Sequence, residues 1–303
     1  MCLVFNSMRL LVVAAMVLVL VLLLVAYFTM LERKVLGYGQ LRKGPNKVVF
    51  LGLGQPLLDG VKLMMKSFHP LMGGVGWAYL GLPMLVFVVM MSVWSVSLSI
   101  FGMFGVLYYM LVFMVLVGLM VLSVFVLSVY SGSKYGAIGA MRGLAQMVSY
   151  EILMGLILLI VVMVGFSFEF TSSGLLIYFL PLMLVWWVVC VVETNRAPVD
   201  FVEGESELVS GFNVEFGSVL FAMLFLGEYG MMAVYSVVSV YMFCSVGSLS
   251  ASSVLSLGLM VMFLWWRLTF PRYRYDLLMD LSWSVFLPVV LVFFLSSFVL
   301  ISL

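Results

Sequence analysis

LLVVAAMVLVLVLLLVAYFTML, residues 10–31, is an apolar stretch without a single charged side chain. About 20 helical residues cross the hydrocarbon core of a bilayer, so this stretch is long enough to span one. It is also longer than the apolar part of a signal peptide, and we expect it to be retained as a helix. The stretch therefore predicts an integral membrane protein.

The rest of the chain repeats this pattern. Of its 303 residues, 66% are hydrophobic and 9% are charged, whereas soluble domains contain roughly 45–50% apolar and about 25% charged residues. Apolar runs of about 18 residues or more predict eight spans, at residues 10–31, 77–99, 104–129, 144–166, 175–192, 217–241, 252–270 and 281–303. The sequence thus predicts an all-α integral membrane protein in which residues 1–303 form a single membrane domain.

The charge distribution predicts an orientation. If eight spans alternate in direction, the loops at 32–76, 130–143, 193–216 and 271–280 share one side. Counting Arg267 in the last turn of its helix, this side holds 13 of the 14 Lys and Arg residues, and only Arg9 lies opposite. By the positive-inside rule, that side is the matrix or the cytoplasm. The chain is rich in Val, Phe, Gly, Met and Trp and poor in Thr, Gln and His, as expected from a strand-biased organelle genome. We therefore expect an organelle-encoded chain whose long loops lie on the matrix or cytoplasmic side.

The first long loop contains a predicted amphipathic helix at residues 56–68. Asp59, Lys62 and Lys66 lie on one face of this helix. The other face carries apolar residues at helical spacing, namely Leu57, Leu58, Val61, Met64, Met65 and Phe68. Such a helix is typical of the membrane interface; a solvated helix within the loop is the alternative.

The chain lacks the motifs of a redox or nucleotide-binding subunit. Its cysteines, Cys2, Cys190 and Cys244, are isolated, with no CxxC pair or Cys/His cluster for zinc or iron–sulfur ligation. Neither a GxGxxG nor a GxxxxGKS/T motif is present. We expect no metal and no cofactor bound by this chain alone, and the few basic residues exclude a nucleic-acid partner.

The loop at residues 193–216 reverses the charge pattern of its side. Against one base, Arg196, it carries six acids: Glu193, Asp200, Glu203, Glu205, Glu207 and Glu215. The loop is either a solvated segment that docks a basic partner or a cluster that exchanges protons near neutral pH. The spacing of Glu203 and Glu207 favours proton exchange, because i,i+4 carboxylates on a helix repel each other.

Two further acids lie inside predicted spans. Glu151 is about two turns into the fourth span and Glu228 about three turns into the sixth, where an acid costs roughly 2.5–3.5 kcal/mol. A carboxyl group at such a depth suits proton relay, because burial changes its proton affinity. The alternative is a buried acid that is satisfied by Tyr150, Tyr229 or a serine.

Several long strings occur together in this sequence. They are ERKVLGY at 32–38, QLRKGPN at 40–46, SYE at 149–151, ETNR at 193–196, EGESELVSGFN at 203–213 and PRYRYD at 271–276. Together they closely resemble subunit 1 of the respiratory NADH:ubiquinone oxidoreductase, complex I, from the first span into the eighth. The resemblance implies eight transmembrane helices plus one amphipathic helix, which the hydropathy predicts independently.

The resemblance also implies a function. That family's subunit 1 is a core membrane subunit of a proton-pumping enzyme. It forms the membrane part of the quinone-binding tunnel and an acidic path that couples quinone reduction to proton translocation. Electrons from NADH reach the substrate ubiquinone through FMN and iron–sulfur clusters on partner subunits. The implied partners are the peripheral-arm subunits at the quinone site, small membrane subunits and lipids. The implied location is the mitochondrial inner membrane, with the long loops on the matrix side.

Residue roles follow from the same resemblance. Arg33, Asp59, Arg272 and Arg274 would line or shape the quinone path. The proton-coupling path would contain Glu151, Glu193, Asp200, Glu203, Glu205, Glu207 and Glu228. No residue of this chain is expected to be catalytic or to bind a metal.

Two other functions compete with this interpretation. A secondary ion transporter would also use intramembrane acids. Such folds show related halves with paired broken helices, whereas Pro83, Pro181 and Pro288 lie at no corresponding positions. A structural anchor that docks a soluble arm is the second alternative, and the intramembrane acids Glu151 and Glu228 weigh against it.

Overall fold

The computed structural model describes residues 2–67, 76–99, 108–130, 133–165, 180–200, 216–244 and 248–302, and all regular structure within them is helical. The helices are α1 (Cys2–Gly39), α2 (Gln55–Met65), α3 (Gly76–Ser99), α4 (Tyr109–Tyr130), α5 (Lys134–Gly165), α6 (Leu180–Glu193), α8 (Ser218–Phe243), α9 (Leu249–Thr269), α10 (Tyr275–Asp280) and α11 (Leu287–Ser302). A 3-10 turn, η1 (Phe50–Gly52), precedes α2, and a π-helical turn, η3 (Leu281–Phe286), joins α10 to α11.

Seven helical units of the described chain are long and apolar enough to cross a membrane: α1, α3, α4, α5, α8, α9 and the continuous unit α10–η3–α11. The remaining predicted span, residues 175–192, corresponds to α6, which has 14 residues. At 1.5 Å per residue this length covers about 21 Å, less than the ~30 Å of a bilayer core. Within the part of the chain that the structure describes, there are therefore seven candidate spans and one shorter apolar helix, where the hydropathy predicted eight spans.

Three helical units extend beyond the predicted apolar stretches by six residues or more. α1 continues past residue 31 to Gly39, α5 begins at Lys134 instead of residue 144, and the last unit begins at Tyr275 instead of residue 281. The i→i−4 backbone hydrogen bonds of a helix do not require apolar side chains, so each of these helices continues for further turns that carry polar residues. The extension of α1 places Glu32 and Arg33 on a regular helix.

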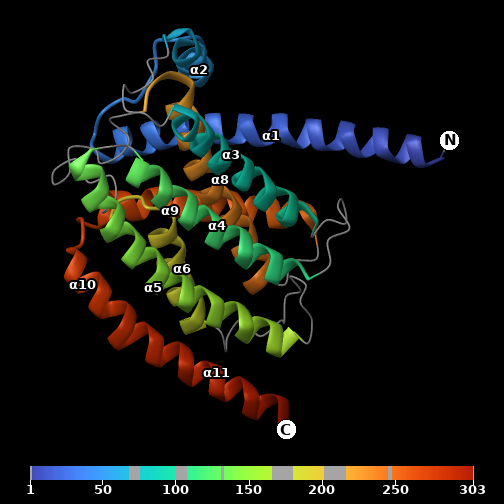
Figure 1. The fold of residues 1–303 in the computed structure, drawn as a ribbon, viewed down its shortest axis with the longest axis vertical. Coiled ribbons are helices and arrows are strands. Elements are labelled where there is room, and N and C mark those ends of the chain that lie inside the picture. The colour runs from blue at the N-terminus through green and yellow to red at the C-terminus, as the bar shows by residue number, and fades with distance from the viewer. Residues whose placement is uncertain are drawn as a thin grey trace.

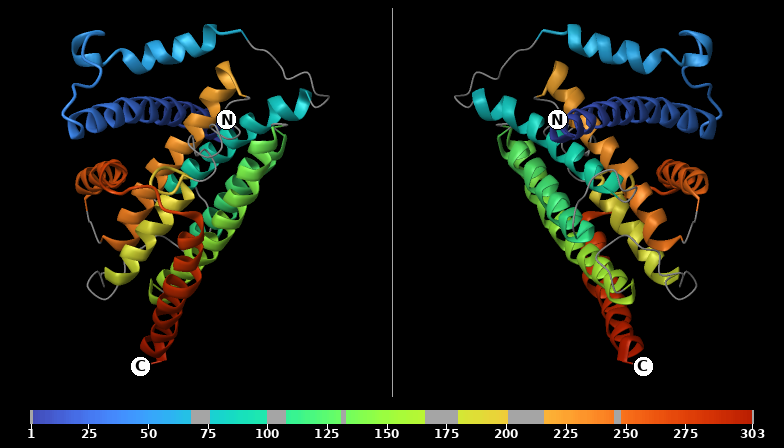
Figure 2. Two further views of the ribbon diagram at one scale, coloured as in Figure 1. Left: turned by 90° about the vertical axis from the view of Figure 1, so that its left-hand side faces the viewer. Right: turned by 90° about the vertical axis from the view of Figure 1, so that its right-hand side faces the viewer.

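The helices pack as a series of neighbours. α3 contacts both α4 and α8, α4 contacts α5, and α8 contacts α9 and α1. The last unit, α10–η3–α11, packs against α5. α1 and α2 consequently lie at one end of the molecule and α11 at the other (Figure 1), and side views show α2 alongside α1 (Figure 2).

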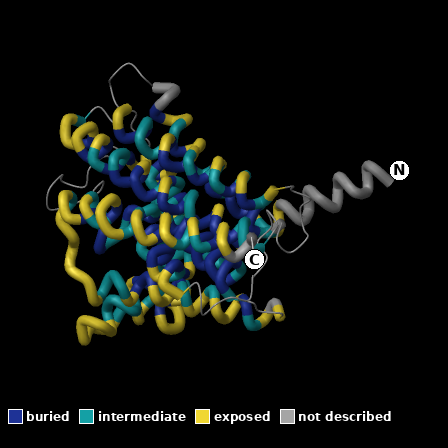
Figure 3. Tube along the Cα trace, turned by 90° about the horizontal axis from the view of Figure 1, so that it is seen from below, coloured by how far each residue is buried: buried dark blue, intermediate teal, exposed yellow. Residues whose placement is uncertain are grey.

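The core lies where these helices meet (Figure 3). Its largest fully buried side chains include Trp186 of α6, Tyr150 of α5, Tyr235 of α8 and Phe113 of α4. Large apolar side chains such as Leu295 of α11 are exposed on the outer surfaces. Lipid tails are as apolar as these side chains, so their exposure does not oppose folding in a bilayer.

A tight turn brings the chain from α1 back to α2. Gly52 adopts φ +84°, a left-handed conformation that glycine accepts without strain. A methyl group on Gly37 would lie 3.1 Å from the backbone nitrogen of Gly44, so α1 and the turn approach closely. Pro56 stands in the first turn of α2, as predicted. The helix Gln55–Met65 confirms most of the predicted amphipathic helix; its place in the interface stays a prediction.

Candidate functional site

A large cavity of about 750 Å³ lies between α1, α2 and α8. Much of its wall is apolar, formed by Leu22, Val25, Ala26 and Leu36 of α1, Leu63 and Met64 of α2, and Phe221, Ala222, Phe225 and Leu226 of α8. The polar and charged side chains that line it include Glu32, Arg33, Asp59, Arg196, Tyr229 and Arg267. Small-molecule sites have volumes of roughly 300–1,000 Å³ and combine apolar walls with a few polar groups, so this cavity is a candidate ligand site.

Arg33 and Asp59 join α1 to α2 at this cavity. Nη1 of Arg33 donates to Oδ2 of Asp59 at 2.9 Å, and Nε2 of Gln55 donates to Oδ1 of Asp59 at 2.9 Å. The Arg33 side chain is 56% exposed, so water weakens the ion pair. The structure thus brings together two residues that the resemblance assigned to the quinone path.

Glu32 is a buried acid, only 4% exposed. Its carboxylate accepts hydrogen bonds from the hydroxyl of Tyr229 on α8 and from Nη1 of Arg267 on α9. A buried carboxylate is costly unless it is hydrogen-bonded and paired, and these two partners supply both interactions. The contacts tie the polar end of α1 to α8 and α9.

Arg196, in the segment after α6, pairs with the intramembrane acid Glu228 of α8. Its Nη2 lies 2.6 Å from Oε2 of Glu228, and the two side chains are only 11% and 15% exposed. The guanidinium group also lies over two aromatic rings of α8, 5.0 Å from the centroid of Phe225 and 4.5 Å from that of Tyr229. Aromatic faces attract cations, so the two rings and the carboxylate of Glu228 jointly fix the position of the Arg196 guanidinium group.

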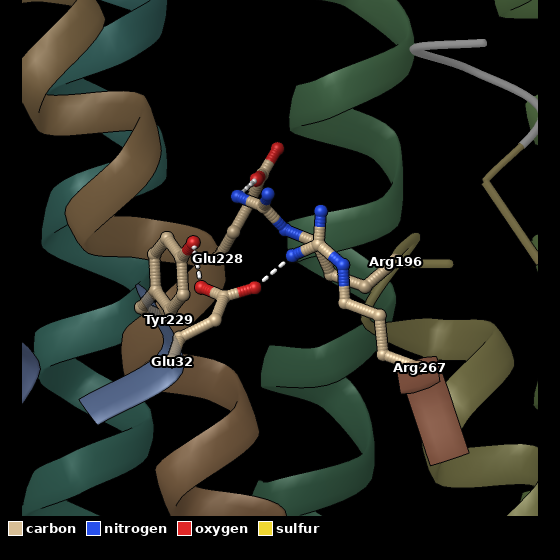
Figure 4. Close-up of polar contacts among 5 residues, drawn as sticks. All are labelled: Glu32, Arg196, Glu228, Tyr229 and Arg267. Atoms are coloured by element: carbon tan, nitrogen blue, oxygen red, sulfur yellow. Dashed lines mark hydrogen bonds and ion pairs between the residues drawn. The ribbon is translucent and has the colours of Figure 1, made fainter. Parts of the chain in front are cut away.

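Glu32, Arg196, Glu228, Tyr229 and Arg267 form one charged cluster (Figure 4). Three of its members, Glu32, Arg196 and Arg267, also line a common small cavity. The cluster contains two acids and two bases, so its formal charges balance. Paired charges of this kind can stay inside a protein where single ones cannot.

A further small cavity connects the charged cluster to α5. It is lined by Glu228 and by Glu193 at the end of α6. Oε1 of Glu193 is enclosed and has no hydrogen-bond partner among the described residues. Glu193 also interacts electrostatically with Glu151 of α5. Glu228 and Glu193 therefore share one cavity, and Glu151 on α5 lies near enough to Glu193 for the two charges to influence each other.

Arg272 and Arg274 lie in the connection from α9 to α10, and neither is among the described residues that line the large cavity. Nη2 of Arg272 lies 3.9 Å from Oδ2 of Asp200, and Nε of Arg274 lies 3.1 Å from Oδ2 of Asp276 on an exposed surface. Their part in the quinone path stays a prediction. Three other predicted site residues, Glu203, Glu205 and Glu207, lie outside the described residues.

The sequence pattern assigned no role to Glu32 or Arg267, although both belong to the charged cluster. Glu32 is the acid that directly follows the first apolar stretch, and this position could have marked it. Its partners could not have been found, because Tyr229 is 197 residues away and Arg267 is 235 residues away. Tyr229 is one of the residues expected to satisfy a buried acid, and its hydroxyl donates to Glu32.

This fold and this site define a class: a multi-pass helical membrane protein with paired acids and bases in its interior. The profile of a protein family described as NADH dehydrogenase matches residues 12–298. The NADH-ubiquinone oxidoreductase chain 1 of Heterololigo bleekeri is 42% identical over 288 residues, which cover 89% of this chain and 90% of that protein. The protein of the same name from Oncorhynchus mykiss is 41% identical over 286 residues, covering 89% and 88%. That from Branchiostoma lanceolatum is 40% identical over 277 residues, covering 88% of each.

The chain therefore belongs to the family of NADH-ubiquinone oxidoreductase chain 1. It is a membrane subunit of NADH:ubiquinone oxidoreductase, complex I of the respiratory chain, and other subunits of the complex are its partners. Ubiquinone is the substrate of the complex. The family that the sequence strings indicated is thus confirmed.

Proposed function

We propose that this chain forms the membrane part of the quinone-binding tunnel of the complex. The large cavity of about 750 Å³ between α1, α2 and α8 carries the proposal. A quinone combines an apolar isoprenoid tail with a polar headgroup, and the cavity combines apolar walls with charged and polar side chains. Arg33 and Asp59, which the resemblance assigned to the quinone path, both line it.

The donors of the charged cluster suit the headgroup of a quinone. Its two carbonyl oxygens accept hydrogen bonds, and Arg196, Tyr229 and Arg267 bring guanidinium and hydroxyl donors to the cavity. Phe221 and Phe225 offer apolar surface for the ring and the first isoprenoid units. The electrons arrive from partner subunits, and this chain binds and orients the acceptor.

We further propose that Arg196 and Glu228 transmit the charge of the reduced headgroup. Quinone reduction takes up two electrons and two protons, so the headgroup is negative whenever electrons precede protons. Arg196 lines the large cavity and lies 2.6 Å from Glu228, so a negative headgroup competes with Glu228 for the guanidinium group. The resulting change in proton occupancy would pass through the small cavity to Glu193 and onward to Glu151.

The resemblance supports the remaining assignments. Asp200, Glu203, Glu205 and Glu207 would belong to the same acidic path, and Arg272 and Arg274 would shape the quinone path. We place the chain in the mitochondrial inner membrane with α6 as part of an eighth crossing. The separation of the basic residues supports this topology, because it requires an even number of spans.

Narrowing the cavity tests the tunnel. Ala222 lines the cavity from α8, and Ala222→Phe would fill part of the space that a quinone needs. We expect inhibitor-sensitive NADH:quinone reductase activity to fall about tenfold with a raised KM for quinone, while NADH oxidation by a water-soluble artificial acceptor is kept. Ala251→Phe on α9, which does not line the cavity, is the matched control. If the two assembled variants have the same quinone reductase activity and the same KM for quinone, the tunnel proposal is wrong.

Neutralising one acid tests the coupling path. Glu228→Gln keeps the size of the side chain and removes its charge. We expect fewer protons translocated per NADH oxidised in the assembled enzyme, with artificial-acceptor activity unchanged. If proton translocation and quinone reduction both stay at the wild-type level, the buried acids have a structural role only. The alternative of a structural membrane anchor would then be favoured.

A further inference from the structure

α4 and α5 pack against each other through two reciprocal contacts. Gly118 of α4 faces the side chain of Glu151 on α5, and Gly155 of α5 faces Met114 on α4. Residues four apart lie on the same face of a helix. The two contacts are therefore neighbours on one antiparallel interface, with each helix placing one large side chain over a glycine of the other.

The two glycines differ in what a larger residue would meet. A methyl group on Gly118 would lie 2.6 Å from Oε1 of Glu151 and 3.7 Å from its Cδ. A methyl group on Gly155 would lie 3.0 Å from Cε of Met114, the end of a flexible side chain that can move aside. The space at Gly118 is thus occupied by a carboxylate oxygen, whereas the space at Gly155 is occupied by the terminal methyl group of Met114.

The same turn of α4 borders the small cavity of the proposed acidic path. Val117 and Val121, on either side of Gly118 in the sequence, line the cavity that Glu193 and Glu228 also line. Both valines are buried. α4 therefore contacts the carboxyl group of Glu151 at Gly118 and the cavity of Glu193 at the neighbouring positions.

We propose that Gly118 is a positioning residue that fixes the carboxyl group of Glu151 against α4 in the acidic path. With no Cβ at this position, the carboxylate oxygen comes close to the backbone of α4, where Cα–H groups can contact it. Any side chain at position 118 would displace the carboxyl group relative to Glu193. The inference rests on the proposed role of Glu151 in proton coupling and adds the group that holds Glu151 in place.

Gly118→Ala tests the proposal in the assembled enzyme. Because proton transfer depends steeply on geometry, we expect proton-coupled quinone reduction to fall about tenfold or more. Gly155→Ala adds the same methyl group to the same interface and is the matched control, expected to stay near the wild-type activity. Equal losses for the two variants would mean that both glycines serve packing alone, and the proposal would be overturned.

Two double variants separate positioning from packing. The first combines Gly118→Ala, which adds a methyl group, with Glu151→Asp, which shortens the acid by one methylene. We expect this double variant to have higher activity, or to assemble better, than either single variant. In a Glu151→Gln background, Gly118→Ala should cause little further loss, because its effect passes through the carboxylate. The proposal would be contradicted if Glu151→Asp restored no activity to Gly118→Ala and if Gly118→Ala also caused its full loss of activity in the Glu151→Gln background.

Infrared difference spectroscopy distinguishes failure of this inference from failure of the proposed function. The carboxyl band assigned by its loss in Glu151→Gln should shift in Gly118→Ala and stay in place in Gly155→Ala. If Glu151→Gln leaves proton translocation unchanged, the acidic path through Glu151 is wrong, yet the band still decides whether Gly118 positions the group. An unshifted band in Gly118→Ala overturns the positioning role even where Glu151 proves essential.

Discussion

Arg196 shows how much one side chain can connect in this protein. It lines the large cavity, forms an ion pair with Glu228 and lies over the rings of Phe225 and Tyr229. Because it contacts the cavity and the acid together, a charge that appears in the cavity would, in the proposed function, act on Glu228 through this single group. This dual position explains why an arginine, with a planar cation and several donors, suits the site better than a lysine.

Removing the Arg196 cation should separate its two roles. Arg196→Gln takes away the ion pair of Glu228, and we expect it to destabilise the packing around α8 by roughly 3–5 kcal/mol and to reduce quinone-coupled activity. Arg196→Lys keeps the charge but loses the planar stacking, so its activity should lie between those of wild type and Arg196→Gln. Thermal stability and quinone reductase activity of the isolated complex measure both effects.

The double variant Arg196→Gln with Glu228→Gln provides the control. Removal of both charges leaves no unpaired carboxylate, so its stability should exceed that of Arg196→Gln alone. If the double variant is the less stable of the two, the ion pair contributes little, and packing of the Arg196 side chain explains the loss.

Among the elements, the last helical unit departs most from regular α-helix. η3 interrupts it with a π-helical turn, and just before that turn the carbonyl of Leu278 accepts a hydrogen bond from the hydroxyl of Tyr150 at 3.0 Å. π-helical turns are rare and often lie at functional sites. Here the turn packs against α5, the helix that carries Glu151 next to Tyr150.

Tyr150→Phe should loosen the π-helical turn. The change removes the hydroxyl but keeps the ring, so it removes one buried hydrogen bond with a net value of about 1 kcal/mol. We expect faster amide hydrogen exchange in residues 281–286 of the assembled complex. Tyr135→Phe, at an exposed position of the same helix, serves as the control, and equal exchange in both variants would assign the turn's stability to apolar packing.

The elements could be predicted to different extents for physical reasons. Apolar stretches such as residues 10–31 signal a helix because a bilayer requires it, so the cores of seven helical units were predicted. The turns of α1 that carry Glu32 and Arg33 lie outside the apolar stretch, so hydropathy could not extend the helix to Gly39. The π-helical turn was also missed, since no residue type specifies an i→i+5 pattern.

The candidate site was predicted in part. Intramembrane acids are unfavourable in lipid, so Glu151 and Glu228 could be recognised from their depth alone. The pairing of Glu228 with Arg196 and of Glu32 with Arg267 depends on how α1, α8 and α9 pack, which no local pattern contains. The position of Gly118 opposite Glu151 is likewise a property of the assembled helix pair.

At the scale of the whole molecule, the number of crossings decides which charges share a side. With eight crossings, Lys134 and Ser248 lie on opposite sides of the membrane; with seven, in which α6 does not cross, they lie on the same side. In a chain whose Cys2, Cys190 and Cys244 are replaced by serine, we expect Lys134→Cys and Ser248→Cys to react with a membrane-impermeant maleimide from opposite sides. Labelling of both from one side would contradict the eight-span topology.

The pairing of Glu32 has a consequence for biosynthesis. Arg33 acquires its partner Asp59 only 26 residues later in the chain, whereas Tyr229 and Arg267 follow Glu32 by 197 and 235 residues. At roughly 5–20 residues per second, a ribosome supplies Asp59 within seconds but the two partners of Glu32 only after about 10–50 s. During this interval the nascent first helix carries an acid whose final partners do not yet exist. The protein must therefore be inserted with Glu32 still in contact with water or a temporary partner, and α1 can take its final place only when translation is almost complete.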